Sequence, residues 1–436
     1  MLQAVRRNTE LGLIVLGTLV TVGAYLLASL AQDASIPANI GPFLAVVIGL
    51  QLAAHLAIRR LAPNADGTLV PIAALLNGIG YVFIVRLDEA RADPKGLAGL
   101  QSVWVAVGIV AFVATLVFVR RVRDLERYRW TIGFLGIGLL LLPLVPGIGR
   151  EYFGARIWVS IGPINFQPGE FAKILLAIFF ASYLVEKREL LAVSSRRLGP
   201  ISLPDPKHLG PVLLAWAASL IVMISQKDLG SSLLFFTLFV VLLWVATERG
   251  TFLLIGVVLF AFGAVFAHSQ FSHVQDRVDI WLDPWEDPKG DGFQIVEAQF
   301  AFSAGGATGT GINLGSPNRI PLAETDFIYA AIGEELGLVG ASAVLLAYLL
   351  MIGAGLRIAL RTEVPFERLL ATGLTVLLGV QSFIIIAGVL RVLPLTGVTL
   401  PFVSYGGSSL IANYVLLALL LRISDDTAAR QEVMVG

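Results

Sequence analysis

The chain has 436 residues, of which 56% are hydrophobic and only 14% charged, and its mean hydropathy is +0.82. Soluble domains carry about 25% charged residues, so this composition predicts a polytopic helical membrane protein. Basic and acidic residues number 31 each, so there is no basic excess that would indicate binding to nucleic acid. The absence of cysteine excludes disulfides, thiolate nucleophiles and cysteine-ligated metals, and four scattered histidines give no basis for a histidine-rich metal site.

Apolar runs of about 20 residues, the length that crosses the hydrocarbon core of a bilayer, recur along the chain. The first run follows Arg6 and Arg7 and is longer than a usual signal-peptide core, so we expect an uncleaved span. The tenth run is too long for one plain span and is expected to begin with a shallow segment around Phe327–Glu335. The sequence therefore predicts an all-α fold with about twelve spans, near residues 10–31, 41–58, 68–86, 98–119, 131–147, 168–185, 209–225, 229–247, 251–268, 327–356, 369–390 and 403–422.

The distribution of lysine and arginine predicts the orientation of these spans. Most basic residues fall in loops on one side, including the cluster from Arg120 to Arg129. Because basic loops stay in the cytoplasm, both termini are predicted to be cytoplasmic and the segment His273–Asp326 external. The polar segment after Arg422 is expected to be a short disordered tail. No internal repeat of the kind that many transporters carry is visible.

The segment His273–Asp326 is long and polar, and the steps Asp283-Pro284 and Asp287-Pro288 predict a shaped loop in place of one long helix. Aspartates beside proline and glycine often only make turns. Alternatively, the acids could bind a divalent cation such as Mg²⁺ or Mn²⁺, or one could be the general base for a hydroxyl nucleophile. The acids are Asp276, Asp279, Asp283, Glu286, Asp287 and Asp291, and Arg277, Lys289 and Arg319 lie among them.

A second polar segment, Gly154–Trp158, leads into the span that begins near Pro168. Proline is favoured at the first position of a helix, so Glu170 and Lys173 are expected one turn apart on one helix face, close enough to pair. Ionisable groups inside a span face a partner or a cavity. The pair is therefore either a structural ion pair or part of a site.

Two further segments carry polar and small residues at the ends of spans. In Gln226–Ser232, Asp228 is predicted to cap the helix that follows. In Pro394–Ser409, the glycines and serines before the last span would allow close approach of helices. Composition and spacing together give an outward-facing polar site on a membrane protein, and they do not identify a reaction.

Taken together, these segments resemble the shape, elongation, division and sporulation (SEDS) family, to which RodA and FtsW belong. The resemblance covers roughly Gly154 to Arg422, and its six segments follow one another in the family's order. They read G-A-R-x-W at Gly154–Trp158, Q-P-x-E-x-x-K at Gln167–Lys173, K-D-L-G-S-S at Lys227–Ser232, D-P-x-x-D-P with G-x-G-F-Q at Asp283–Gln294, T-D-F-I and G-E-E-L-G within Thr325–Gly337, and L-P-F-V-S-Y-G-G-S-S at Leu400–Ser409. The chain departs from the family's usual residues at Ile157, Gly169, Lys227, Glu324 and Ile385.

The resemblance implies a peptidoglycan glycosyltransferase that polymerises lipid II, a disaccharide-pentapeptide carried on undecaprenyl pyrophosphate. The attacking 4-hydroxyl is a poor nucleophile at neutral pH, so a positioned carboxylate base would help, and the family's catalytic aspartate maps onto Asp287. The leaving pyrophosphate needs cationic stabilisation, which Arg156 and Lys173 would supply. The other predicted substrate-binding residues are Glu170, Arg277, Gln294, Asp326, Ser404 and Ser408. No cofactor is implied with certainty, and a divalent cation stays open.

The resemblance also implies the organisation and setting of the protein. Residues 131–424 would form a catalytic core with the external loop 269–326, residues 1–130 would include an extra pair of spans, and residues 425–436 would be the cytoplasmic tail. The implied setting is a bacterial cell membrane, with a class B penicillin-binding transpeptidase as partner and a role in elongation or division. A lipid II flippase and a scaffold for other cell-wall enzymes are the alternative functions.

Overall fold

The structure is a computed structural model that describes residues 2–33, 40–91, 93–152, 154–162, 164–192, 194–198, 201–204, 214, 217–218, 221–222 and 224–435. Among these residues, ten helices are long and apolar enough to cross a membrane, which agrees with the predicted helical membrane class. They are α1 (Leu2–Asp33), α2 (Ile40–Leu61), α3 (Leu69–Glu89), α4 (Leu97–Phe118), α7 (Pro168–Ala192), α9 (Leu229–Thr247), α10 (Gly250–Gln270), α13 (Ile328–Arg361), α14 (Pro365–Val389) and α15 (Gly407–Val435).

Two of the twelve predicted spans are not among these ten. The run at 131–147 forms the shorter helix α6 (Arg129–Leu141), which follows the single-turn helix α5 (Asp124–Arg127) and continues into the 3₁₀ helix η1 (Leu142–Leu144). The run at 209–225 lies mostly outside the described residues. The long tenth run does break as expected, because Gly337 inside α13 has a non-helical backbone with φ +65°.

The chain divides into two compact units, and each is described by itself. The first contains Met1–Arg120, Asp279–Ala354 and Gln381–Gly436, and the second contains Arg121–Val278 and Gly355–Val380. In the first unit, α1 packs on α3, and α4 packs on α2 and α15. A Cβ added at Gly108 of α4 would lie 2.5 Å from the Tyr414 ring, and one added at Gly407 of α15 would lie 2.4 Å from the Trp104 ring. Small residues therefore permit close helix approach here, as predicted for the start of the last span.

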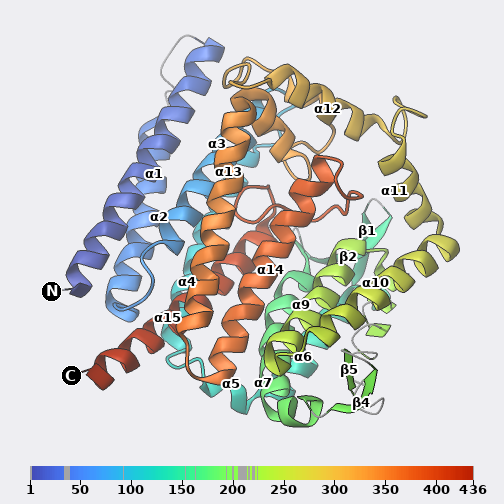
Figure 1. The fold of residues 1–436 in the computed structure, drawn as a ribbon. Helices are drawn as coiled ribbons and strands as arrows, with labels where there is room; N and C mark the ends of the chain where they lie inside the picture. Colours follow the sequence, from blue (N-terminus) through green and yellow to red (C-terminus); the bar gives the residue numbers. More distant parts are fainter. Residues whose placement is uncertain are drawn as a thin grey trace. The chain divides into compact units, whose positions relative to one another are not determined.

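Both termini lie at one end of the first unit (Figure 1), where a buried polar network involves α1, α2 and α15. Arg7 pairs with Glu10, and His55 Nδ1 lies 2.8 Å from Glu10 Oε1. The backbone N–H of Asn64 donates to Asp425 Oδ1 at 2.7 Å. The expectation of a disordered tail after Arg422 is wrong, because α15 continues to Val435 and Asp425, beyond Arg422, takes part in this network.

The opposite end of the first unit carries the predicted external loop. Asn313 Nδ2 from this loop donates to the carbonyl of Ala28, near the end of α1, at 3.1 Å. Both termini thus lie at one end of the unit and the loop at the other, with α12 (Phe293–Gly305) above the helix ends in Figure 1. This two-sided arrangement matches the prediction that the loop and the termini face opposite sides.

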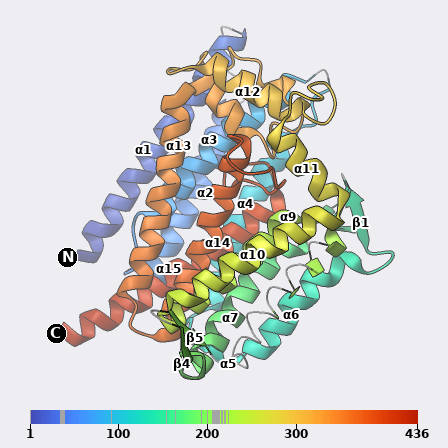
Figure 2. The ribbon, with the colours of Figure 1, turned by 45° about the vertical axis from the view of Figure 1, so that its right-hand side comes forward.

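In the second unit, α7 packs against α6 and α9, and α9 packs against α10, as both views show (Figure 2). The second unit also contains two small antiparallel sheets, which were not predicted from the sequence. One has the order β1 (Gly149–Tyr152), β2 (Ala155–Ile161) and β3 (Ile164–Phe166), with Val159 opposite Phe166. The other pairs β4 (Ser194–Leu198) with β5 (Ile201–Pro204).

Candidate functional site

The external loop contains two helices joined by a tight turn. Helix α11 (Ser272–Leu282) ends just before Asp283, and α12 begins after Gly292. Arg391 fixes the end of α11, because its Nε donates to the carbonyl of Trp281 at 2.7 Å while Trp281 Nε1 donates to the carbonyl of Arg391 at 3.1 Å. Trp285 packs edge-on against Phe300 of α12, with ring centroids 5.7 Å apart. The segment between the helices is therefore anchored at both ends, as a shaped loop.

Both aspartates that precede proline in this turn accept backbone hydrogen bonds. Asp283 Oδ1 accepts from the N–H of Trp285 at 3.1 Å, and Asp287 Oδ1 accepts from the N–H of Gly290 at 3.0 Å. Asp287 Oδ2 also accepts from the N–H of Asp291 at 3.4 Å. Both side chains are exposed. A carboxylate has about four lone-pair sites, so these turn contacts leave Asp287 with free acceptor capacity toward a substrate.

The six acids of the loop do not gather into a cation site. No group of three or more histidine, aspartate or glutamate side chains suited to hold a metal ion occurs among the described residues. The acids were interpreted as turn formers, as cation ligands or as a general base. Contacts of the first kind are present at Asp283 and Asp287.

The rest of the loop is held by backbone contacts with the break in α13. Gly309 has φ +84°, and a Cβ there would lie 2.2 Å from the carbonyl oxygen of Glu335. The N–H of Thr310 donates to the carbonyl of Glu334 at 2.9 Å, and the N–H of Leu338 donates to that of Gly306 at 2.9 Å. Positive φ and this close approach require glycine, which explains the spacing of glycines in the loop.

A buried ion pair also ties this loop to α3, and the sequence analysis missed it. Arg86 Nε lies 2.8 Å from Glu335 Oε1, and their side chains are 5% and 0% exposed. Arg86 also donates to the carbonyl of Gly315 at 2.9 Å, and Glu335 Oε2 accepts from the N–H of Asn313 at 3.0 Å. A charged residue inside each of two spans was the available signal, because such residues usually pair.

Glu324, one of the positions that depart from the family's usual residues, forms a second contact of the loop with α3. It pairs with Arg91 just beyond the end of that helix, and Arg91 lies 3.5 Å from Asp88 as well. The departure from the family residue therefore creates an ion pair at this position. Unlike Arg86, Arg91 is partly exposed.

The structure brings the Thr325-Asp326-Phe327 segment against the Leu400–Ser404 segment. Ser404 Oγ donates to the carbonyl of Thr325 and accepts from the N–H of Leu400, and the N–H of Tyr405 donates to the carbonyl of Glu324 at 2.8 Å. Burial raises the pKa of Tyr405, so its phenol stays protonated and can donate. A Cβ at Gly397 would lie 3.6 Å from Asp326 Oδ2. Two segments far apart in sequence thus form one surface.

Two hydroxyls beside this surface were not predicted. Thr396 Oγ1 and Thr399 Oγ1 are buried and have no hydrogen-bond partner among the residues that the structure describes. Buried polar atoms almost always have a partner, so these hydroxyls can bond to a ligand or to water. Ser408 is buried, and Gln294 Nε2 donates to the carbonyl of Pro321 at 3.4 Å.

In the second unit, the predicted helix start and ion pair are both present. Helix α7 begins at Pro168, and Lys173 Nζ lies 2.9 Å from Glu170 Oε2, with side chains only 7% and 5% exposed. Arg156 lies on β2, which contacts α7. Because side chains alternate along a strand, Arg156 shares a face with Trp158, while Ile157 shares the other face with the buried Val159. The apolar residue at 157 suits that face.

The Glu170–Lys173 pair gives a testable stability difference. Removing one partner leaves an unpaired charge in a buried place, so Glu170→Ala or Lys173→Ala should each destabilise the protein by about 3 kcal/mol. The double variant should be more stable than the worse single one. Thermal unfolding of the three purified variants measures this. Equal stability of all three with the parent would mean that the pair is solvated.

Arg277 lies in a group of basic side chains. The pKa of His273 is lowered by burial and by the nearby Lys227 and Arg277 cations. Next to Lys227, Asp228 caps α9 as predicted, because its side chain accepts from the N–H of Ser231 at 3.0 Å.

The predicted site residues divide between the two units. Asp287, Gln294, Asp326, Ser404 and Ser408 belong to the first unit, where Asp326 and Ser404 lie on one surface. The second unit contains the predicted residues Arg156, Glu170, Lys173 and Arg277, of which Glu170 and Lys173 are in direct contact. All three predicted cations, Arg156, Lys173 and Arg277, belong to the second unit.

Comparisons with known proteins agree on one family. The cell cycle protein family FTSW_RODA_SPOVE matches residues 67–429. The chain is 46% identical to the peptidoglycan glycosyltransferase RodA of Mycobacterium tuberculosis over 424 residues, which are 96% of this chain and 90% of the relative. It is 34% identical to the probable peptidoglycan glycosyltransferase FtsW of Geobacter metallireducens over 368 residues, 82% of this chain and 94% of that relative.

Solved structures give the same result. A chain from a peptidoglycan synthase complex that coordinates polymerization and crosslinking is 31% identical, with a TM-score of 0.67, covering 83% of this chain and 98% of that one. The rod shape determining protein RodA of Thermus thermophilus is 28% identical, with a TM-score of 0.59, covering 83% of this chain and 97% of that one.

Proposed function

This chain belongs to the FtsW, RodA and SpoVE family of cell cycle proteins and is a peptidoglycan glycosyltransferase of cell-wall synthesis, and on that premise we propose that it polymerises lipid II with Asp287 as general base. In this reaction the 4-hydroxyl of the acceptor sugar attacks C1 of the donor sugar. The C1–O bond to the lipid pyrophosphate breaks, and the pyrophosphate leaves with the bonding electrons. The hydroxyl proton passes to the Asp287 carboxylate.

The anchored turn around Asp287 is the observation that supports this role most. Arg391 holds the end of α11 before the turn, and Trp285 packs on α12, so the carboxylate is fixed relative to the first unit. It is exposed and retains free lone pairs beyond its two backbone contacts. A base must reach the proton that it removes, and an exposed, fixed carboxylate meets that need.

The cations of the second unit suit the leaving group. Developing negative charge on the pyrophosphate is stabilised by fixed positive groups, and Arg156, Lys173 and Arg277 are the candidates. Glu170 holds Lys173 in place at 2.9 Å. In the first unit, Asp326, Ser404, Ser408 and Gln294 would bind the sugars, and the unpartnered hydroxyls of Thr396 and Thr399 offer two further hydrogen bonds.

Purified protein in liposomes with lipid II tests the function. A polymerase makes glycan strands without any other enzyme, whereas a flippase only moves lipid II between leaflets, and a scaffold does neither. Strands on a gel would support the proposal. Transport of lipid II without strands would favour the flippase. Folded protein that neither polymerises nor transports lipid II would favour the scaffold.

We also propose that the chain has twelve spans, with both termini cytoplasmic and the loop external. The domain limits would be 1–130 for the N-terminal spans, 131–424 for the core with its loop 269–326, and 425–436 for the cytoplasmic tail. The opposite ends occupied by the termini and the loop in the first unit support this orientation.

Cysteine labelling provides a direct test of this orientation. The chain has no cysteine, so single cysteines at the exposed positions Lys289 and Glu432 have no background. In intact cells, a membrane-impermeant maleimide should label Lys289→Cys and leave Glu432→Cys unlabelled until the cells are opened. The reverse pattern would overturn the orientation.

The proposed partner is a class B penicillin-binding transpeptidase. The structural relative from a peptidoglycan synthase complex, which couples polymerization and crosslinking, supports such a partnership. Growing strands would then pass from this chain to an enzyme that crosslinks them. Co-purification from cells that express both tagged proteins would detect the complex.

A further inference from the structure

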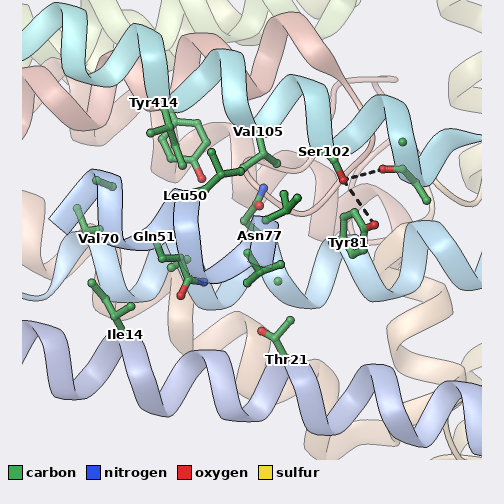
Figure 3. Close-up of a pocket in the computed structure, with 18 residues that line it drawn as sticks. Ile14, Thr21, Leu50, Gln51, Val70, Asn77, Tyr81, Ser102, Val105 and Tyr414 are labelled. Carbon is green, nitrogen blue, oxygen red and sulfur yellow. Dashed lines mark hydrogen bonds between the residues drawn. The ribbon is translucent and has the colours of Figure 1, made fainter. Parts of the chain in front are cut away.

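A cavity of 320 Å³ lies in the first unit, and none of the residues proposed for catalysis or substrate binding lines it. Its walls come from α1, α2, α3, α4 and α15 (Figure 3). Ile14 and Thr21 of α1 face Ser102 and Val105 of α4 across it. Since the family match begins at residue 67, the cavity lies between the two additional N-terminal helices and the part of the chain that the family shares.

The lining of the cavity is suited to an apolar ligand. Most lining side chains are aliphatic, among them Ile14, Leu50, Val70 and Val105. Several of the polar ones are bonded within the protein, and Gln51 accepts a hydrogen bond from Thr18 through its Oε1 atom. Thr21 Oγ1 donates to the carbonyl of Gly17 at 3.0 Å, Asn77 Nδ2 to that of Phe402 at 3.2 Å, and Ser102 Oγ to that of Ala98 at 3.0 Å. A polar ligand would gain few hydrogen bonds here.

The cavity opens near the N-terminal ends of the spanning helices α2 and α4. Val46 of α2 is 44% exposed, Gly99 of α4 is exposed, and both line it. These residues lie within two neighbouring spanning helices, so the fluid at the opening is lipid chain. Apolar cavities exclude water and accept apolar molecules. We infer that a hydrocarbon chain of a membrane lipid occupies this cavity and joins α1 and α2 to the rest of the first unit.

Two glycine variants separate filling of the cavity from a general effect. A Cβ at Gly99 meets nothing within 4 Å, so the side chain of Gly99→Leu can enter the opening. Gly49 of α2 is equally open and exposed but does not line the cavity, so Gly49→Leu is the matched control. Ala74→Leu fills the cavity from α3 and guards against misfolding of one variant.

The test uses the full chain in phosphatidylglycerol vesicles that carry a diazirine in one acyl chain, with a second set that carries a diazirine polyprenyl phosphate. Light should label peptides of α1–α4 from one of these lipids, which identifies the source of the chain.

Each buried methylene contributes about fourfold to binding, so displacing two of them should reduce labelling at least about tenfold in Gly99→Leu and Ala74→Leu. Gly49→Leu should label like the parent. Absence of cavity labelling from both lipids, or undiminished labelling in the filled variants, would overturn the inference.

Discussion

Glu335→Leu should destabilise the protein by about 3–5 kcal/mol, because it leaves the buried Arg86 guanidinium without its carboxylate. Arg86→Met should cost a similar amount, since the buried Glu335 would then lack its cation. The double variant removes both charges and replaces them with apolar groups, and such replacement of a buried pair is often neutral or stabilising. The four proteins form a double-mutant cycle that isolates the coupling between the two side chains.

Arg91→Ala is the matched control for this cycle. Arg91 follows the same helix and binds the same external loop through Glu324, but its side chain is 25% exposed. Solvent reaches the Arg91 guanidinium, although Glu324 is only 9% exposed, so losing Arg91 should cost less than losing Arg86. Thermal unfolding in detergent measures all five proteins. Losses at Arg86 and Arg91 of the same size would contradict the claim that burial makes the Arg86–Glu335 pair decisive.

The positions of the spans were predictable from the sequence because the bilayer requires long apolar runs. Helices α9 and α10 begin within one residue of their predicted starts, and α7 begins at Pro168 as expected. The ion pair of Glu170 and Lys173 was also predictable, because residues three apart on a helix lie on one face. Local geometry was sufficient in each of these cases.

Contacts between distant segments were not predictable from one sequence. Arg86 and Glu335 are 249 positions apart, and nothing local indicates which charged residue each one meets. The sheet β1–β3 was missed because β1 and β3 have only four and three residues, although β2 alternates apolar residues over seven positions. The continuation of α15 beyond Arg422 was missed because the polarity of that segment suggested a tail, whereas Asp425 accepts a hydrogen bond from the backbone of Asn64 in the turn after α2.

The aspartates of the external turn show where sequence and structure complement each other. The Asp-Pro steps predicted turns, and the structure contains them, with both carboxylates bonded to backbone N–H groups. The family resemblance, however, distinguishes Asp287 from Asp283, and the geometry of the two is much alike. The difference between them is therefore a matter for activity measurements.

Asp287→Asn should reduce the polymerisation rate by about 10²–10⁴-fold, the usual contribution of a general base. The amide oxygen can still accept from Gly290, so the turn should persist and lipid II should still bind. Asp283→Asn makes the same chemical change in a residue that is also exposed, also precedes proline and also accepts one backbone N–H. It should keep most of the activity. Unfolding temperatures of both variants should match the parent.

The most direct measurement of the proposed mechanism is the length and amount of glycan strands that purified parent, Asp287→Asn and Asp283→Asn make from lipid II at equal protein concentration. We expect long strands from the parent and from Asp283→Asn, and almost none from folded Asp287→Asn. Near-normal strands from Asp287→Asn would contradict the assignment of Asp287 as general base. Equal loss in the two variants would also contradict it, because the turn contacts that they share would then explain the result.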